Sequence, residues 1–182
     1  AGVYGNNISD PVVEDMPLKS ECVYDSAKIA AEEVVKNYGL ECGIFRIGFV
    51  YGPGRIHECP IAMLLREVRE NGCVEWNAGL DQYLDYVFID DVTDGFVKAV
   101  EAEKLKYRVY NMGGGRLTPF RDVVDIVRKL YSHAQVKIGR GGLGYDNIGR
   151  MDNSRAREDF GYEPKITLEE GIRRYDEWLT GF

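Results

Sequence analysis

The chain has 182 residues, of which 45% are hydrophobic and 29% are charged, and its formal net charge is −7. This is the composition of an ordinary globular protein that is long enough for a real core. The negative charge argues against nucleic-acid binding, because no basic excess is available to neutralise phosphates. No apolar run approaches the ~20 residues that span a membrane, so we expect neither a nucleic acid nor a membrane as a partner.

The cysteines and histidines form no familiar metal or disulfide pattern. No C-x-x-C pair occurs among the cysteines, which are Cys22, Cys42, Cys59 and Cys73. This favours reduced, mostly buried thiols in a cytosolic protein. The segment His57, Glu58 and Cys59 holds three ligand types, but adjacent residues rarely converge on one ion. We therefore expect a cytoplasmic protein without a metal site.

Hydrophobic spacing predicts alternating helices and strands after a loop over residues 1–20. Apolar side chains recur at three- and four-residue spacing from Val23 to Tyr38, and Gly39 follows as a helix C-cap. The apolar run 42–52 indicates a buried strand of the parallel type. The later predicted elements are a helix over 59–72, a strand over 83–89, a helix over 90–104, a strand over 107–114, a helix from Pro119 to about Tyr131, a strand over 135–139, and helices over 153–160 and 167–180.

Local signals add detail to this alternation. Thr118 can cap the helix that begins at Pro119, and Thr167 with Glu170 forms a capping box. The glycine-rich segment 139–144 lacks the lysine of a P-loop and does not lead from a strand into a helix, so it indicates a mobile loop rather than a phosphate site. The alternation as a whole predicts an α/β fold of packed layers with parallel strands.

Tyr24 and Lys28 stand four residues apart in the first predicted helix, and therefore on one face of it. A surface tyrosine beside a lysine is common and needs no function. A free tyrosine keeps its proton at neutral pH, because its pKa is near ~10. A neighbouring cation lowers the pKa of a tyrosine, which would let it act as a general base toward a substrate hydroxyl. Ser26 lies off this face, and we assign it no role.

Several other motifs occur in a fixed order around this pair. They are "VYG" at 3–5, Y-x-x-x-K at 24–28, "FRIGFVYGPG" at 45–54, "DYVFIDDV" at 85–92, "YNMGGG" at 110–115 and "DNSRAREDFGYEP" at 152–164. This ordered set resembles the extended short-chain dehydrogenase/reductase family, in its NAD-dependent sugar epimerase/dehydratase branch. The resemblance extends over nearly the whole chain and corresponds to the C-terminal half to two-thirds of a family member.

The resemblance implies the C-terminal part of a Rossmann-like parallel sheet with helices, plus a smaller α/β substrate-binding domain. On this basis residues 1–52, rejoined by 85–114, belong to the cofactor-binding domain. Residues 53–84 and 115–182 belong to the substrate-binding domain. The family's glycine-rich loop and its catalytic Ser/Thr precede the position of Ala1, so we expect this chain alone to bind NAD poorly and to be nearly inactive.

The resemblance also assigns roles near the cofactor, which is NAD or NADP. Tyr24 matches the catalytic base, and Lys28 matches the residue that favours its ionised form and contacts the nicotinamide ribose. Ile47, Gly48 and Phe49 match the stretch beside the nicotinamide. The helix over 24–38 matches an interface through which family members often form homodimers.

The expected substrate is a sugar or nucleotide sugar, as for a UDP-glucose 4-epimerase. Two positions depart from the nucleotide-sugar pattern, with Phe49 in place of asparagine and Leu84 in place of arginine. Arg55, Arg140 and Arg150 remain as anion contacts. Two alternatives therefore stay open: an NAD-dependent dehydrogenase of a non-nucleotide sugar or sugar acid, and an inactive or NAD-sensing truncated relative.

Overall fold

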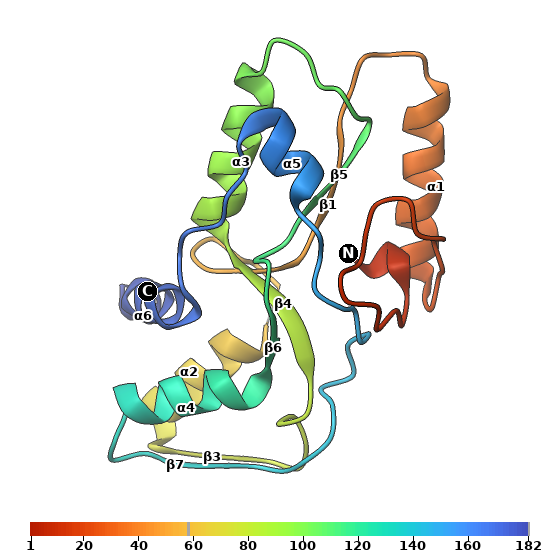
Figure 1. Ribbon diagram of the computed structural model, residues 1–182. Helices are drawn as coiled ribbons and strands as arrows, with labels where there is room; N and C mark the ends of the chain where they lie inside the picture. The colour runs from red at the N-terminus through yellow and green to blue at the C-terminus, as the bar shows by residue number, and fades with distance from the viewer. Residues whose placement is uncertain (58, 182) are drawn as a thin grey trace.

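The computed structural model describes residues 1–57 and 59–181, in which helices and strands alternate as the α/β prediction requires (Figure 1). The elements are η1 (Gly2–Tyr4), α1 (Val23–Asn37), β1 (Ile44–Ile47), β2 (Phe49–Tyr51), α2 (Pro60–Asn71), β3 (Cys73–Trp76), β4 (Tyr83–Phe88), α3 (Ile89–Glu101), β5 (Val109–Met112), β6 (Leu117–Pro119), α4 (Phe120–Leu130), β7 (Gln135–Ile138), α5 (Ser154–Phe160) and α6 (Leu168–Thr180). None of the helices in these ranges is long and apolar enough to cross a membrane.

Gly48 divides the predicted strand 42–52 into two. β1 pairs in parallel with β5, whereas β2 pairs in parallel with β4. A Cβ atom at Gly48 would lie 2.7 Å from the carbonyl oxygen of Asp85 and 3.1 Å from the Cα atom of Gly113. Because both contacts are with backbone atoms, only glycine lets the chain change partners at this point.

Two strands were not predicted, and one predicted helix cap is wrong. β3 pairs in parallel with β7, and β6 pairs antiparallel with β4, so the sheets are not all parallel. Thr118 lies in β6 opposite Leu84, and the N-cap of α4 is Pro119, which has no side-chain cap. The ladder with β4 therefore overrides the capping preference of Thr118. The Thr167 cap is confirmed, since its Oγ1 accepts a hydrogen bond of 3.2 Å from the amide of Glu170.

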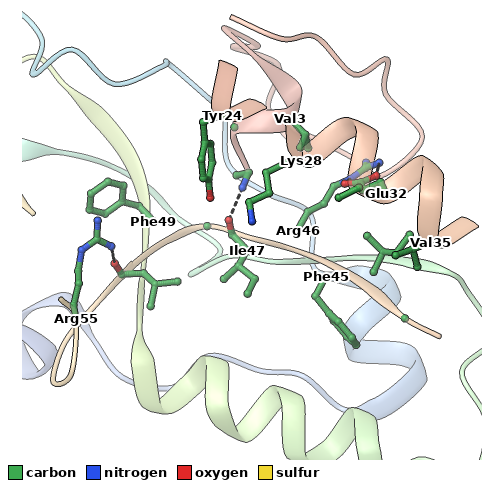
Figure 2. Close-up of a pocket in the computed structure, with 17 residues that line it drawn as sticks. Val3, Tyr24, Lys28, Glu32, Val35, Phe45, Arg46, Ile47, Phe49 and Arg55 are labelled. Atoms are coloured by element: carbon green, nitrogen blue, oxygen red, sulfur yellow. Dashed lines mark hydrogen bonds and ion pairs between the residues drawn. The ribbon is translucent and has the colours of Figure 1, made fainter. Parts of the chain in front are cut away.

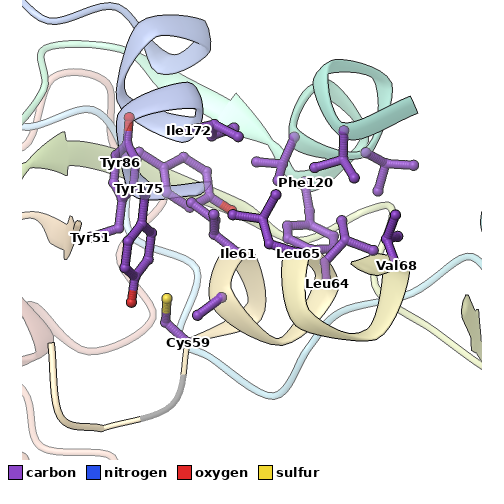
Figure 3. Close-up of a cluster of buried hydrophobic side chains, with 14 of the residues drawn as sticks. Tyr51, Cys59, Ile61, Leu64, Leu65, Val68, Tyr86, Phe120, Ile172 and Tyr175 are labelled. Carbon is purple, nitrogen blue, oxygen red and sulfur yellow. The ribbon is translucent and has the colours of Figure 1, made fainter. Parts of the chain in front are cut away.

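The largest apolar core lies where α2, α4 and α6 meet. Figure 3 shows Ile61, Leu64 and Leu65 of α2 beside Phe120 of α4 and Ile172 of α6, and all five are fully buried. A smaller core packs α3 and α5 against β5. A third core packs Val3, Tyr4 and Val12 of the N-terminal segment against Met151. The division into cofactor and substrate domains stays a prediction.

A buried polar network joins the N-terminal segment to α1 and β1. Arg46 donates from Nε and Nη2 to the two carboxylate oxygens of Glu32, at 2.9 and 2.8 Å. Its Nη1 donates to the Tyr4 hydroxyl at 2.9 Å and to the Glu14 carbonyl at 2.8 Å. The Tyr4 hydroxyl donates in turn to Asn111 Oδ1 at 2.6 Å. Each of the three guanidinium nitrogen atoms of Arg46 therefore donates at least one hydrogen bond, as a buried charge requires.

The glycine-rich segment 139–144 is held by side chains rather than open to an anion. The Gly141 amide donates to Asp81 Oδ2 at 3.0 Å, and the Leu143 amide donates to Gln82 Oε1 at 2.9 Å. The segment follows β7 and leads into no helix. The amides of Gly141 and Leu143 are therefore not free to bind a phosphate. This supports the prediction that the segment is not a phosphate site.

Candidate functional site

Tyr24 and Lys28 occupy the first turns of α1, and they meet as their spacing predicts. The Lys28 Nζ atom lies 5.3 Å from the centroid of the Tyr24 ring. Figure 2 shows both side chains reaching toward β1 and the segment that follows it. Tyr24 is 66% exposed. Within the described ranges Lys28 makes no hydrogen bond and no ion pair, so its charge is not neutralised by a carboxylate.

The first cavity beside this pair has a volume of about 600 Å³ and lies between α1 and β1. Ile47, Gly48 and Phe49 line it together with Tyr24 and Lys28, so the structure brings all five predicted cofactor-side residues to one place. Its apolar lining and the Lys28 ammonium suit a flat ring attached to a polar ribose.

The second cavity has a volume of about 450 Å³ and lies on the other side of Tyr24. Six residues line both cavities, namely Ala1, Gly2, Tyr24, Gly48, Phe49 and Arg55. The second cavity continues to Leu84 of β4 and to Tyr145 on the loop before α5. Tyr24 therefore lies at the junction of two spaces, where a group can act on one molecule while contacting another.

Phe49 and Arg55 contact each other where the two cavities adjoin. The Arg55 guanidinium carbon lies 5.0 Å from the centroid of the Phe49 ring, in cation–π range. The Phe49 ring also makes edge-on contacts with Tyr86 and Tyr145, at centroid distances of 5.6 and 5.2 Å. Leu84 is 6% exposed and belongs to the main core, so this side of the second cavity is largely apolar.

Two predicted anion contacts are not brought to either cavity. Arg140 is exposed on the glycine-rich segment, near Asp81. Arg150 pairs with Asp10, with 2.9 Å between Nε and Oδ1. Charge alone predicts that both arginines contact an anion. The packing of the loop before α5 decides where they lie.

The structure also reveals carboxylates in the second cavity that sequence reasoning missed. Asp25, Asp85 and Asp146 all line it. Asp85 is 5% exposed, and its Oδ2 accepts a hydrogen bond of 2.9 Å from the Met151 amide. Burial raises the pKa of Asp85 to about 6, although nearby amides act in the opposite direction. A charged residue inside the apolar strand 83–89 was a signal that could have pointed to it.

No metal site is found among the residues that the structure describes. Glu58, the middle residue of the segment 57–59 considered above, lies outside the described residues. His57 lines the second cavity, and Cys59 is fully buried at the start of α2.

Comparisons with known proteins agree with this geometry. The sequence model of the NAD dependent epimerase/dehydratase family matches residues 1–113. UDP-glucose 4-epimerase of Mycolicibacterium smegmatis is 32% identical over 186 residues, which cover 97% of this chain and 59% of that protein. UDP-glucuronate 4-epimerase 2 of Arabidopsis thaliana is 26% identical over 209 residues, which cover 100% of this chain and 47% of that protein.

A solved structure is also similar to nearly the whole of this chain. It is that of TunA, described as a NAD dependent NDP-hexosamine 5,6-dehydratase involved in tunicamycin biosynthesis, and it matches with a TM-score of 0.87 at 26% identity. The match covers 99% of this chain and 61% of TunA. The chain thus spans about half of the length of the curated relatives it matches. With a family model over more than half of its residues, the chain belongs to the NAD dependent epimerase/dehydratase family.

Proposed function

We propose that this chain carries the proton-transfer site of an NAD(P)-dependent sugar or nucleotide-sugar epimerase, similar to UDP-glucose 4-epimerase, with Tyr24 as the base. The observation that carries the proposal is the position of Tyr24, which lines both cavities and has the unpaired Lys28 beside it. A base for this reaction has to reach a substrate hydroxyl on one side while a hydride acceptor is held on the other.

The residues of the first cavity fit the nicotinamide end of the cofactor. The Lys28 ammonium makes no hydrogen bond or ion pair within the described ranges and can bind ribose hydroxyls, and the apolar Ile47 and Phe49 can lie against the ring. The pyrophosphate end has no such match, because the G-x-G-x-x-G segment 139–144 opens no helix and its amides are engaged elsewhere. The fit therefore covers one end of the cofactor.

Bound NAD would supply a hydride acceptor at a carbon that bears a hydroxyl group. The Tyr24 Oη atom, as phenolate, accepts the proton of that hydroxyl and later returns it. The positive charge of Lys28 stabilises the phenolate, since no carboxylate among the described residues neutralises that charge. Phe49 and Arg55 line both cavities, so they border the place where the reacting carbon and the hydride acceptor would meet.

The second candidate is a dehydrogenase of a sugar without a nucleotide. It is favoured by the buried Leu84 and by Phe49, which together give the second cavity an apolar wall where a diphosphate would need cationic donors. Arg55 is the one arginine that lines this cavity among the described residues. The two candidates share Tyr24 and Lys28 and differ in the substrate that the cavity accepts.

The test compares Tyr24→Phe with the unchanged protein, using the chain together with any coding sequence that flanks it in its gene. UDP-glucose, UDP-glucuronate and free sugars are supplied with NAD, and product stereochemistry and reduced-nicotinamide absorbance are followed. We expect turnover to fall about 10²- to 10⁴-fold. Tyr38→Phe is the matched control, because Tyr38 follows the same helix, is 73% exposed and lines neither cavity.

Lys28 is tested in the same assay. Lys28→Met should lower turnover and weaken NAD binding, whereas Lys129→Met should change neither, because Lys129 is exposed on α4 and lines neither cavity. Full turnover in Tyr24→Phe would overturn the proposal. Reduced nicotinamide that accumulates with a free sugar, and not with a nucleotide sugar, would favour the second candidate.

A further inference from the structure

The second cavity is lined by charged groups of both signs. Asp25 and Asp146 line it, and so does Arg55 beside Phe49. Tyr24 also lines this cavity. A sugar bound here for proton transfer to Tyr24 would therefore have carboxylates close to it.

The Asp25 carboxylate is fixed in place. Asp25 is 2% exposed, and its Oδ2 accepts hydrogen bonds from the Glu21 amide at 3.3 Å and from the Cys22 thiol at 3.2 Å. Its Oδ1 lies against the Cα atom of Gly2, where a Cβ atom would collide with it. None of these hydrogen bonds comes from a cation, and the Ala1 ammonium, which lines the same cavity, lies within the electrostatic field of this carboxylate.

Asp146 lies in this field. Burial is the main reason why the pKa of Asp146 is raised, and the neighbouring charges of Asp25 and Glu21 raise it further. The nearest cation, Lys19, is committed to Glu21 at 2.6 Å. Two carboxylates that repel each other in a cavity gain stability when a hydroxyl or ammonium donor is placed between them.

A third carboxylate has an oxygen without a partner. Asp85 lines the same cavity, and its Oδ1 is buried without a well-directed hydrogen bond, although the amides of residues 114–116 lie close enough to favour the charged form. Buried polar atoms of folded proteins are nearly always paired, so an unpaired oxygen beside a cavity indicates a ligand donor or water.

Arg55 does not offset these three charges for a ligand. Its Nη1 donates to the Val50 carbonyl, and its Nε donates to the His57 carbonyl at 3.1 Å. One face of its guanidinium lies against the Phe49 ring. Most of its directional hydrogen bonding is thus used within its own loop, whereas the Asp146 carboxylate accepts no hydrogen bond from a described residue.

We propose that the second cavity selects sugars by charge, and that Asp25 and Asp146 accept hydrogen bonds from a neutral or ammonium-bearing pyranose while disfavouring a uronate. The proposal rests on the proposed function in one respect, which is that the second cavity holds the sugar. It names Asp146 as a specificity-determining residue.

The test uses the chain together with any coding sequence that flanks it in its gene, labelled with ¹⁵N, and three probes: glucosamine, methyl β-glucopyranoside and glucuronate. Each is titrated at pH 7.5 and low salt, and binding is followed by the amide shifts of Gly48, Tyr145 and Met151, which line the cavity. We expect glucosamine to bind more tightly than glucuronate by about five- to tenfold, with the neutral glycoside between them. The contrast should shrink as salt is raised.

Asp146→Asn should reduce this contrast to about twofold or less. Asp125→Asn is the matched control, because Asp125 lies on α4, is largely exposed and pairs with Arg128 away from the cavity. Glucuronate binding as tightly as glucosamine, an unchanged contrast in Asp146→Asn, or the absence of cavity shifts with all three probes would overturn the proposal. If turnover still depends on Tyr24 in any of these cases, the proposed function stands and charge selection alone is wrong.

Discussion

The region of α2, α4 and α6 and the region of α1 are held together in different ways. In the first, each helix buries an apolar stripe, and Ile61, Leu64 and Phe120 are fully enclosed. In the second, the buried side chains of α1 within the described ranges are two carboxylates, Asp25 and Glu32. Most of the apolar side chains of α1 point outward.

This difference separates stability from function. The first region gains its stability from burying apolar area, and its interior has no room for a ligand. The α1 region is fixed by the charged pair of Arg46 and Glu32, which leaves its cavities and its outer face free. The candidate base and the cavity walls lie in this second region. Four sets of variants test this difference between the two regions.

The largest expected effect comes from Arg46→Ala. It leaves the buried Glu32 carboxylate with Lys36 as its counter-charge, 3.8 Å from Oε2, and removes both of its hydrogen bonds to Arg46, so we expect a loss of about 3 kcal/mol in the free energy of unfolding. Urea unfolding followed by circular dichroism measures it. The double variant Arg46→Met with Glu32→Gln removes both charges and should recover at least about half of the loss. A loss below about 1 kcal/mol would contradict the role given to the pair.

Gly171→Ala tests how closely the other region is packed. Alanine normally stabilises a helix relative to glycine by about 1 kcal/mol. In α6 the new Cβ atom would collide with the Tyr51 hydroxyl, so we expect a net loss of about 1–3 kcal/mol instead. The same urea series measures it. Adding Tyr51→Phe removes the colliding oxygen and should restore part of the stability, whereas a stabilising Gly171→Ala would show that this core can adjust.

Asp85 predicts a pH dependence of stability. Its pKa is about 6 in the folded chain, above its ordinary value of 3.8, so the folded state binds the proton more tightly than the unfolded state does. Its contribution to stability is therefore present at low pH and is lost as the pH rises through about 6. Between pH 7 and pH 5 we expect a gain of about 1 kcal/mol relative to Asp85→Asn, which lacks this titration. Thermal unfolding at fixed ionic strength measures the difference, and a difference that does not change with pH would contradict the shift.

The smallest effect on stability is expected at the outer face of α1. Val34 and Tyr38 are 63% and 73% exposed, so Val34→Asp should change the free energy of unfolding by no more than about 0.5 kcal/mol. If this face forms the predicted homodimer, the same variant should shift sedimentation toward the monomer. Asp at the exposed Val100 of α3 is the matched control. Sedimentation that is the same for both variants and for the unchanged chain would argue against a dimer through α1.

Most helices followed from local sequence. Apolar spacing, a glycine at the end of α2 and the Thr167 cap fix their positions, because each depends on residues only a few positions apart. The edges of the sheets did not follow. β3 and β6 exist because of their partners β7 and β4, which are distant in the sequence, and the Thr118 cap was lost to the same pairing.

Residue order alone was enough to predict the α/β class, the contact of Tyr24 with Lys28 and membership of the epimerase/dehydratase family. Each depends on residue order or on neighbours within one helix. Tertiary structure alone decided that Tyr24 lies between two cavities, that Arg140 and Arg150 lie away from both, and that Asp25, Asp85 and Asp146 share one of them. These facts depend on the packing of distant segments, whose register no local pattern encodes.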